Sequence, residues 1–213
     1  MRLLFLYGIH CRKEIWRYIQ IYFNKYETDY VEYPHTVTSN AITVNDITKW
    51  VYKTYSSHCY DAVIAHSLGG IIALQLASAY QMHLKKIILL DTNLKPANAF
   101  YRNLMTNKNF KTYGKETEKM LHEESVFYQN ELLESIQYNF DFTNLLTEIP
   151  QKVYAVYGDR GKPSYPDKIK DLNLSKEIIN RLHINFIENS CHMIMIENPS
   201  SLADTILNII QNQ

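Results

Sequence analysis

The chain has 213 residues, enough for one domain with a substantial hydrophobic core. Lysine plus arginine and aspartate plus glutamate both total 22, and no basic run stands out, which argues against nucleic acid or an anionic membrane as a partner. No apolar run is long enough to span a bilayer, and the N-terminal MRLLFLYGIH is too short for a signal-peptide core. We therefore expect a protein without a membrane span.

The three cysteines also bear on the class of protein. Cys11, Cys59 and Cys191 are odd in number and unrelated in spacing, so they indicate neither a disulfide framework nor a zinc site. A reducing compartment is the simplest setting for such thiols. We expect a cytoplasmic protein with no metal site and no organic cofactor.

Apolar segments of strand length recur along the chain and alternate with helical patterns. The first, RLLFLY, is a nearly continuous apolar run ended by Gly8, as in a strand buried on both faces of a parallel sheet. This alternation predicts an α/β fold with a parallel, doubly wound sheet. The expected strands are residues 2–7, 29–33, 62–65, 86–90, 153–157 and 184–187.

Helical spacing of apolar residues predicts the segments between these strands. Between the first two strands, for example, Ile15, Ile19 and Tyr22 fall on one face, and Asn45-Asp46 is a candidate helix cap later in the chain. The expected helices are residues 12–26, 45–56, 68–79, 169–182 and 202–210.

One interval breaks the alternation. Residues 94–147 are far more than a simple connection between two strands needs, and they show helical patterning at 116–122 and 131–138. We interpret 94–147 as a small helical cap, inserted within a single domain of residues 1–213 over the sheet edge where ligands bind. The alternative is an enlarged helical excursion on the sheet face. Four aromatic residues of this segment are candidate pocket walls: Phe100, Tyr101, Phe127 and Tyr128.

The sequence AHSLG at 65–69 matches the nucleophile elbow G-x-S-x-G, with alanine in the first glycine position. A sharp turn from strand to helix crowds the serine, so the residues two before and two after it must be tiny, as Ala65 and Gly69 are. Ser67 is therefore the candidate nucleophile. The alternative is a simple helix N-cap, but the apolar strand before it, Gly70 after it and a histidine far downstream favour the nucleophile.

A serine nucleophile needs a base within hydrogen-bond reach. His192 follows the last expected strand, which brings it to the same sheet edge as Ser67. We therefore favour His192 as the base over a solvated surface histidine. His66 points away from Ser67 by strand alternation and is expected to support the elbow, while His10 lies on a loop at the same edge.

Backbone amides at this edge can hold a developing oxyanion. The first amide of the helix after the elbow belongs to Leu68, and the turn after the first strand supplies the amide of Ile9. Two such donors form an oxyanion hole, which contributes a few kcal/mol of transition-state stabilisation.

Together these segments resemble the α/β-hydrolase fold. The resemblance is carried by AHSLGG after the third strand, YGD after the fifth and SCHMIMIENP after the sixth, in the chain order serine, acid, histidine. The last segment is similar to the G-H-x-x-x-x-E-x-P ending of many capped esterases and C–C hydrolases. The resemblance implies a minimal form of the fold with about six parallel strands, flanking helices and a small helical cap.

The acid of the triad is the weakest part of the resemblance. In the family it commonly stands three residues after the glycine that ends the penultimate strand, and this chain has Gly161 there. Asp159, in the same turn, and Asp91, which ends the fourth strand, are the two candidates. We favour Asp159, and the alternative that neither carboxylate orients His192 stays open.

The resemblance and the residues together predict a serine hydrolase that cleaves a small or medium ester or thioester through an acyl-enzyme. Ser67 attacks, His192 moves the proton, and the amides of Leu68 and Ile9 hold the oxyanion. The same fold also hosts acyltransferases, lyases and C–C hydrolases. A non-catalytic binding member is the third hypothesis, because Gly161 stands where the acid is expected.

Overall fold

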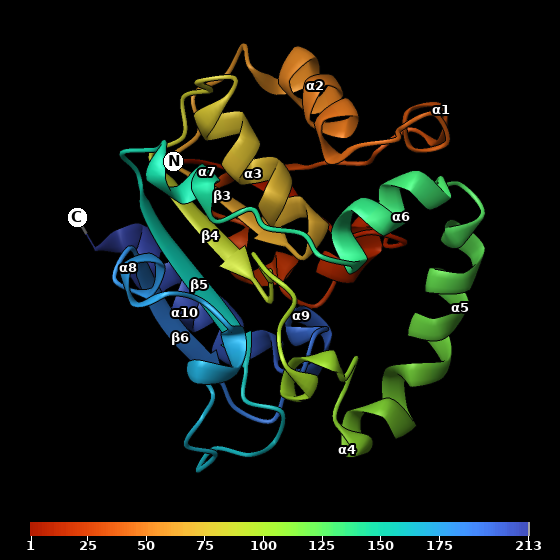
Figure 1. Cartoon of the computed structure of the whole chain (residues 1–213), viewed down its shortest axis with the longest axis vertical. Helices are drawn as coiled ribbons and strands as arrows, with labels where there is room; N and C mark the ends of the chain where they lie inside the picture. The colour runs from red at the N-terminus through yellow and green to blue at the C-terminus, as the bar shows by residue number, and fades with distance from the viewer. Residues whose placement is uncertain (213) are drawn as a thin grey trace.

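A single sheet of six parallel strands forms the centre of the computed structural model, which describes residues 1–212 (Figure 1). The strand order is β2-β1-β3-β4-β5-β6. The central strands consist of almost continuous buried residues, because helices cover both faces of the sheet. The predicted parallel α/β class is confirmed. The strands are β1 (Arg2–Leu6), β2 (Glu27–Tyr30), β3 (Ala62–His66), β4 (Lys86–Leu90), β5 (Lys152–Gly158) and β6 (Leu182–Ile187).

The strand register brings several loops to one edge of the sheet. His66 at the end of β3 is paired with Leu90 at the end of β4, and Gly158 at the end of β5 is paired with Ile187 at the end of β6. The residues that follow these strand ends therefore gather at the carboxyl edge, where ligands bind in open α/β sheets.

Helices form a layer on each side of the sheet (Figure 1). On one side α3 (Leu68–Ser78) packs against the strands, and α2 (Val44–Tyr55) and α7 (Asn144–Thr147) pack against α3. Nearly every residue of α3 is buried, which explains why its sequence is apolar all round. On the other side lie the short α9 (Ile194–Glu197) and the C-terminal α10 (Pro199–Gln211).

Two of the helix predictions are wrong. Residues 12–26 form two 3-10 helices, η1 (Lys13–Trp16) and η2 (Gln20–Phe23), because aromatic and β-branched residues with weak helix propensity already bury their side chains in these short turns. Residues 169–182 are also interrupted: Asn173 adopts a left-handed conformation with φ of 57°. The segment gives η5 (Lys170–Leu172) and α8 (Lys176–Ile179), with Ser175 as the N-cap of α8.

The cap of α2 also differs from the prediction. Helix α2 begins after Thr43, not at Asn45, and Thr43 forms a capping box with Asp46. The Asp46 carboxylate accepts a hydrogen bond from the Thr43 amide at 2.9 Å. Before α2, the chain makes one further short helix, α1 (His35–Thr38).

Residues 94–147 are mainly helical. Helices α5 and α6 stand to one side of the sheet in Figure 1, while α7 at the end of the segment packs on α3. Ion pairs tie α5 to the loop after β1: Arg12 binds Glu124 and, at 2.9 Å, Glu123. The elements of the segment are η3 (Ala99–Arg102), α4 (Asn107–Asn109), the π-helix η4 (Phe110–Gly114), α5 (Lys115–Ser125), α6 (Asn130–Gln137) and α7.

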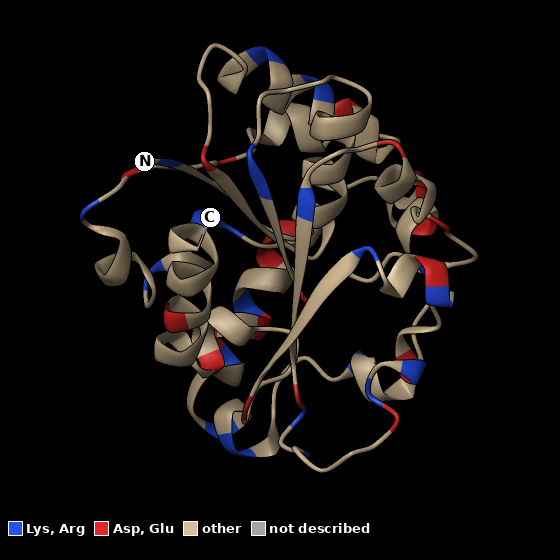
Figure 2. Cartoon of the chain, turned by 90° about the vertical axis from the view of Figure 1, so that its left-hand side faces the viewer, with Lys and Arg blue, Asp and Glu red and all other residues tan. Residues whose placement is uncertain are grey.

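Residues of both charges are interspersed over the helices and loops on the side of the molecule shown in Figure 2. In β1, β4 and β5 the charged residue is the first one, Arg2, Lys86 and Lys152, and the rest of each strand carries no charge, in keeping with its burial. Among residues 1–212, no helix combines the length and the apolar character that crossing a lipid bilayer would take.

Candidate active site

Ser67 lies at a sharp turn between β3 and α3. Its backbone has φ of 52° and ψ of −119°, a conformation that non-glycine residues rarely adopt. Two hydrogen bonds hold it there: the Ser67 amide donates to the Leu90 carbonyl at 3.0 Å, and the Ser67 carbonyl accepts from the Gly70 amide at 2.9 Å. The turn therefore has the strained backbone that a nucleophile elbow requires.

Close backbone packing explains the small residues around this turn. A Cβ atom at Gly69 would lie 2.6 Å from the carbonyl oxygen of Leu6 and 2.8 Å from that of Tyr7, both on the β1 side. At Gly70 a Cβ would lie 2.1 Å from the Thr92 hydroxyl. Ala65 is completely buried within β3. The elbow thus depends on the minimal size of its neighbours.

His192 lies in the loop between β6 and α9 and opens onto the same cavity as Ser67. The cavity has a volume of about 510 Å³, and Asp91 also lines it. Within residues 1–212, no direct hydrogen bond links the Ser67 hydroxyl to the imidazole. Such bonds are often long before substrate binds. The predicted nucleophile and base therefore share one cavity at the carboxyl edge of the sheet.

Asp91, not Asp159, is the carboxylate that holds His192. Nδ1 of His192 lies 3.0 Å from Oδ1 of Asp91, which is completely buried at the end of β4. Asp159 instead accepts backbone hydrogen bonds at 2.8 Å from Gly161 and from Asn189, so it stabilises its own turn and the loop before His192. The preference for Asp159 as the partner of His192 was wrong: Oδ1 of Asp159 is bound to backbone amides, and Nδ1 of His192 is bound to Asp91.

A buried arginine that the sequence analysis did not single out completes this group. Nη1 and Nη2 of Arg160 donate to Oδ2 and Oδ1 of Asp91, both at 2.6 Å. Burial works to raise the pKa of Asp91, but the charge of Arg160 and the hydrogen bonds from His192 and Arg160 outweigh it and hold the pKa well below its usual range. Asp91 is therefore ionised throughout the neutral range.

His66 supports the loop that carries His192. Its Nε2 lies 3.1 Å from the backbone carbonyl of His192, and the two rings are 4.6 Å apart. Burial, together with the positive charge that His192 carries when protonated, lowers the pKa of His66 to about 3. His66 is therefore a neutral donor that fixes the position of the His192 backbone.

The low pKa of His66 predicts a pH-dependent stability. Between about pH 3 and pH 6.5 the unfolded chain binds a proton on His66 that the folded chain does not, so the free energy of unfolding falls as the solution is acidified. We expect His66→Gln to reduce this slope by up to about 1.4 kcal/mol per pH unit between pH 4 and 6. Urea unfolding at several pH values measures it.

The exposed His83 provides the matched control for this measurement. His83→Gln removes a histidine that is exposed in the folded protein, and so controls for the substitution itself. Equal slopes for wild type and His66→Gln would show that His66 takes up its proton in the folded protein.

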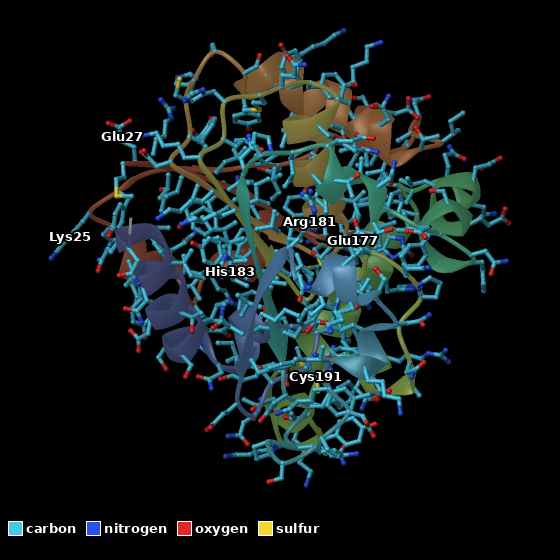
Figure 3. All side chains as sticks on the ribbon, turned by 60° about the vertical axis from the view of Figure 1, so that its left-hand side comes forward. Lys25, Glu27, Glu177, Arg181, His183 and Cys191 are labelled. Carbon is cyan, nitrogen blue, oxygen red and sulfur yellow. The ribbon has the colours of Figure 1, made fainter. Side chains whose placement is uncertain are left out.

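The carboxylate of Glu197 holds the loop after β6 against its surroundings. Glu197 accepts hydrogen bonds from the Cys191 amide at 2.6 Å and from the Thr106 amide at 2.7 Å, which joins this loop to residues 94–147. Arg181 and Cys191, labelled on either side of β6 in Figure 3, lie at opposite ends of the strand.

Burial raises the pKa of the Cys191 thiol to about 12, so this cysteine is an unreactive packing residue.

The two predicted oxyanion donors lie on loops at the same edge. Leu68 is the first residue of α3 after Ser67, and Ile9 follows the end of β1. In the described part of the chain, neither amide donates to another protein group, so both are free to bind a ligand. His10, next to Ile9, has φ of 58° and packs edge-on against Tyr128.

The walls of the cavity differ from the prediction. Phe100 stacks on Tyr165, Tyr101 covers Arg160, Phe127 stacks on His35 and Tyr128 contacts His10, so none of the four predicted aromatics lines the cavity. Its aromatic side chains come from the end of α6 and the following loop. Besides Ser67, Asp91 and His192, the cavity is lined by Leu68, Ile71, Asn93, Pro96, Ala97, Arg102, Ile136, Gln137, Tyr138, Asn139, Phe140 and Phe142.

Comparison with known proteins identifies the fold. No protein-family model matches the sequence, and no curated protein sequence matches it at a significant level. Solved structures do match. A thermophilic esterase from Thermogutta terrifontis aligns with a TM-score of 0.75 at 15% identity, over 99% of this chain and 89% of its own.

Two further solved structures give the same result. A hydrolase from Oleispira antarctica has a TM-score of 0.75 at 13% identity, over 100% of this chain and 91% of its own. The thioesterase domain of a curacin biosynthetic pathway has a TM-score of 0.66 at 14% identity, over 97% and 90%. The chain therefore has the α/β-hydrolase fold, as the resemblance of its motifs predicts.

Proposed function

We propose that this protein is a serine hydrolase that cleaves a small or medium ester or thioester through an acyl-enzyme. The observation that carries the proposal is that Ser67, His192 and Asp91 open on one cavity, with Nδ1 of His192 bound to Asp91. Because Asp91 is an ionised acceptor, Nδ1 carries the proton and Nε2 is left as the basic nitrogen. The enzymes among its structural neighbours support the same class of reaction.

The reaction follows from the roles of these three side chains. Nε2 of His192 removes the proton as the Ser67 hydroxyl attacks the carbonyl carbon of the substrate, and Asp91 stabilises the imidazolium that forms. His192 then donates that proton to the leaving alcohol or thiol. A water molecule, deprotonated by the same nitrogen, then attacks the acyl carbon, and the acid leaves as His192 returns that proton to the Ser67 oxygen.

The oxyanion of each tetrahedral intermediate is assigned to the amides of Leu68 and Ile9. The Leu68 amide stands at the N-terminus of α3, where the helix dipole also favours negative charge. Ile9 belongs to the loop that Arg12 ties to α5.

We assign residues 94–147 to a cap over the site, within one domain of residues 1–213. Support comes from the cavity, whose walls include Ile136, Tyr138 and Phe142 from this segment and Ser67 and His192 from the sheet edge. Its volume of about 510 Å³ suits a short or medium acyl chain, and its lining combines apolar with polar side chains. A non-catalytic protein was an alternative because Gly161 stands where the acid is expected. The contact of Asp91 with His192 argues against that alternative.

A fluorophosphonate probe tests the proposal, because it reacts with an activated serine and not with an ordinary hydroxyl. We expect stoichiometric labelling of Ser67 in the folded protein, lost in Ser67→Ala, together with hydrolysis of p-nitrophenyl butyrate or of a butyryl thioester. Ser57→Ala is the matched control: Ser57 also lies beside a histidine, 2.9 Å from Nδ1 of His58, but on an exposed turn. It is expected to retain full labelling.

Three results separate the hypotheses. An unlabelled Ser67 in folded protein would contradict the proposal and favour a binding role for the fold. Labelling without hydrolysis of either substrate would move the assignment to an acyltransferase, lyase or C–C hydrolase. Labelling with hydrolysis supports the serine hydrolase, and the ratio of the two rates distinguishes an esterase from a thioesterase.

A further inference from the structure

The turn after β5 carries an arginine whose position the proposed reaction does not explain. In the α/β-hydrolase family this turn commonly supplies the acid of the triad. Here Arg160 adopts a left-handed backbone with φ of 59°, and its amide donates to the Ser190 carbonyl at 2.8 Å. This conformation directs the side chain back across the end of β4, where it meets Asp91.

The contacts of Arg160 make it an enclosed partner of one carboxylate. The side chains of Arg160 and Asp91 are 1% and 0% exposed. Besides Asp91, the guanidinium binds the Gly158 carbonyl at 2.7 Å and the Tyr101 carbonyl at 3.3 Å, and its carbon lies 4.6 Å from the centre of the Tyr101 ring. A planar guanidinium bound through both nitrogens fixes the plane of the carboxylate.

This fixed plane determines where His192 can bind. Oδ2 of Asp91 accepts from Arg160 and, at 3.1 Å, from the Gly158 amide, while Oδ1 accepts from Arg160 and His192. Arg160 and the Gly158 amide therefore donate three hydrogen bonds to the carboxylate. One acceptor position on Oδ1 remains for the imidazole. His192 occupies that position.

The charge of Arg160 acts on the same pair. A triad carboxylate stabilises the protonated imidazole, and a cation bound to that carboxylate within a buried site opposes this effect. The other titratable groups around His192 do not replace it: His66 and Cys191 are neutral, and Asp159 and Glu197 are bound to backbone amides of the loop. Arg102 also lines the cavity, but Arg160 is the cation bound directly to Asp91, the partner of His192.

We propose that Arg160 is a positioning residue that orients Asp91 for His192 and, through its charge, keeps His192 in the unprotonated form that acts as base. The inference rests on the proposed serine hydrolase. If this is so, the enzyme with Arg160 stays active at a lower pH than the same enzyme without this arginine.

The test compares the pH dependence of kcat/KM for p-nitrophenyl butyrate in wild type, Arg160→Gln and Arg160→Lys. Arg160→Gln removes the charge, so we expect the acid limb of the profile to move to higher pH by on the order of one unit, with kcat reduced roughly 10- to 100-fold. Arg160→Lys keeps the charge but not the two-point contact. We expect its acid limb to stay at the wild-type position while kcat falls roughly tenfold.

A purely structural role for Arg160 predicts a different pattern. In that case both variants lose rate without any movement of the acid limb, and this result, or an equal movement in both variants, overturns the inference. Circular dichroism shows whether each variant is folded.

The wild-type profile provides a second test that needs no variant, should Arg160→Gln fail to fold. We expect kcat/KM to stay within about twofold of its maximum down to about pH 6.5, the ordinary midpoint for histidine. A rate that already falls steeply above pH 7 overturns the inference. Wild type that neither labels nor hydrolyses any ester contradicts the proposed function itself, so the two failures are distinguishable.

Discussion

Replacing Asp91 with asparagine is expected to lower kcat for ester hydrolysis by about 10⁴-fold. The asparagine side chain cannot stabilise the imidazolium, and it allows His192 to adopt the tautomer that places the proton on the wrong nitrogen. KM is expected to change little, because Asp91 is completely buried and its oxygens are occupied by protein donors. Single-turnover acylation of Ser67 measures the loss directly.

Asp159→Asn is the matched control for this substitution. Asp159 is also buried and also follows a strand end, but its Oδ1 accepts only backbone hydrogen bonds, which an asparagine oxygen can accept equally well. We expect its kcat to stay within about threefold of wild type. A loss in Asp159→Asn that matches the loss in Asp91→Asn would contradict the assignment of Asp91 as the acid.

Stability must be separated from chemistry in this comparison. Asp91→Asn leaves the buried charge of Arg160 without its counter-ion, and breaking a buried ion pair costs about 3–5 kcal/mol. The double variant Asp91→Asn/Arg160→Gln removes both charges and is expected to recover part of this stability. It should still lack activity, because His192 has no anionic partner.

The strands of this protein were predictable because the central sheet is buried on both faces. Such strands must be continuously apolar, and RLLFL, AVIAH and KIILL are. The helices between them were less predictable where the same apolar spacing also satisfies short turns. At residues 13–23, two 3-10 helices bury Ile15, Trp16 and Phe23 without forming the regular helix that the spacing indicates.

The choice of acid could not be made from the sequence because it depends on side-chain direction. Asp91 and Asp159 follow the ends of adjacent parallel strands, so the topology brings both to the same edge. What separates them is local: Asp91 has a left-handed backbone with φ of 44°, while Asp159 is engaged by the amides of its own turn. Neither feature leaves a pattern in the spacing of residues.

Arg160 was missed although the sequence carries an indication of it. An arginine in the short turn GDRG, directly after a buried strand, is unusual, because arginine is rarely buried without a partner. The expectation that this turn supplies the acid drew attention to Asp159 instead. The interpretation of a buried turn should therefore consider its cation as well as its carboxylate.

Gly69→Ala is expected to destabilise the protein by about 3 kcal/mol or more and to abolish labelling of Ser67. Helix propensity alone predicts the opposite sign, since alanine stabilises a helical position by about 1 kcal/mol relative to glycine. The added methyl group would lie 2.6 Å and 2.8 Å from the carbonyl oxygens of Leu6 and Tyr7, which belong to backbone and cannot rotate away. Either β1 or α3 must shift, and with it the elbow.

Gly114→Ala tests whether helix propensity or the steric clash determines the change in the free energy of unfolding. Gly114 is also in a helical segment, and a Cβ there would also meet atoms at 2.8 Å, but those atoms belong to the side chain of Phe110, which is 41% exposed. An exposed ring can rotate, so helix propensity is expected to dominate and the free energy of unfolding to change by less than about 1 kcal/mol. Urea unfolding of both variants measures the difference. If Gly69→Ala proves as stable as Gly114→Ala and Ser67 still labels, the contact of the elbow with the β1 backbone is not what holds the nucleophile in place.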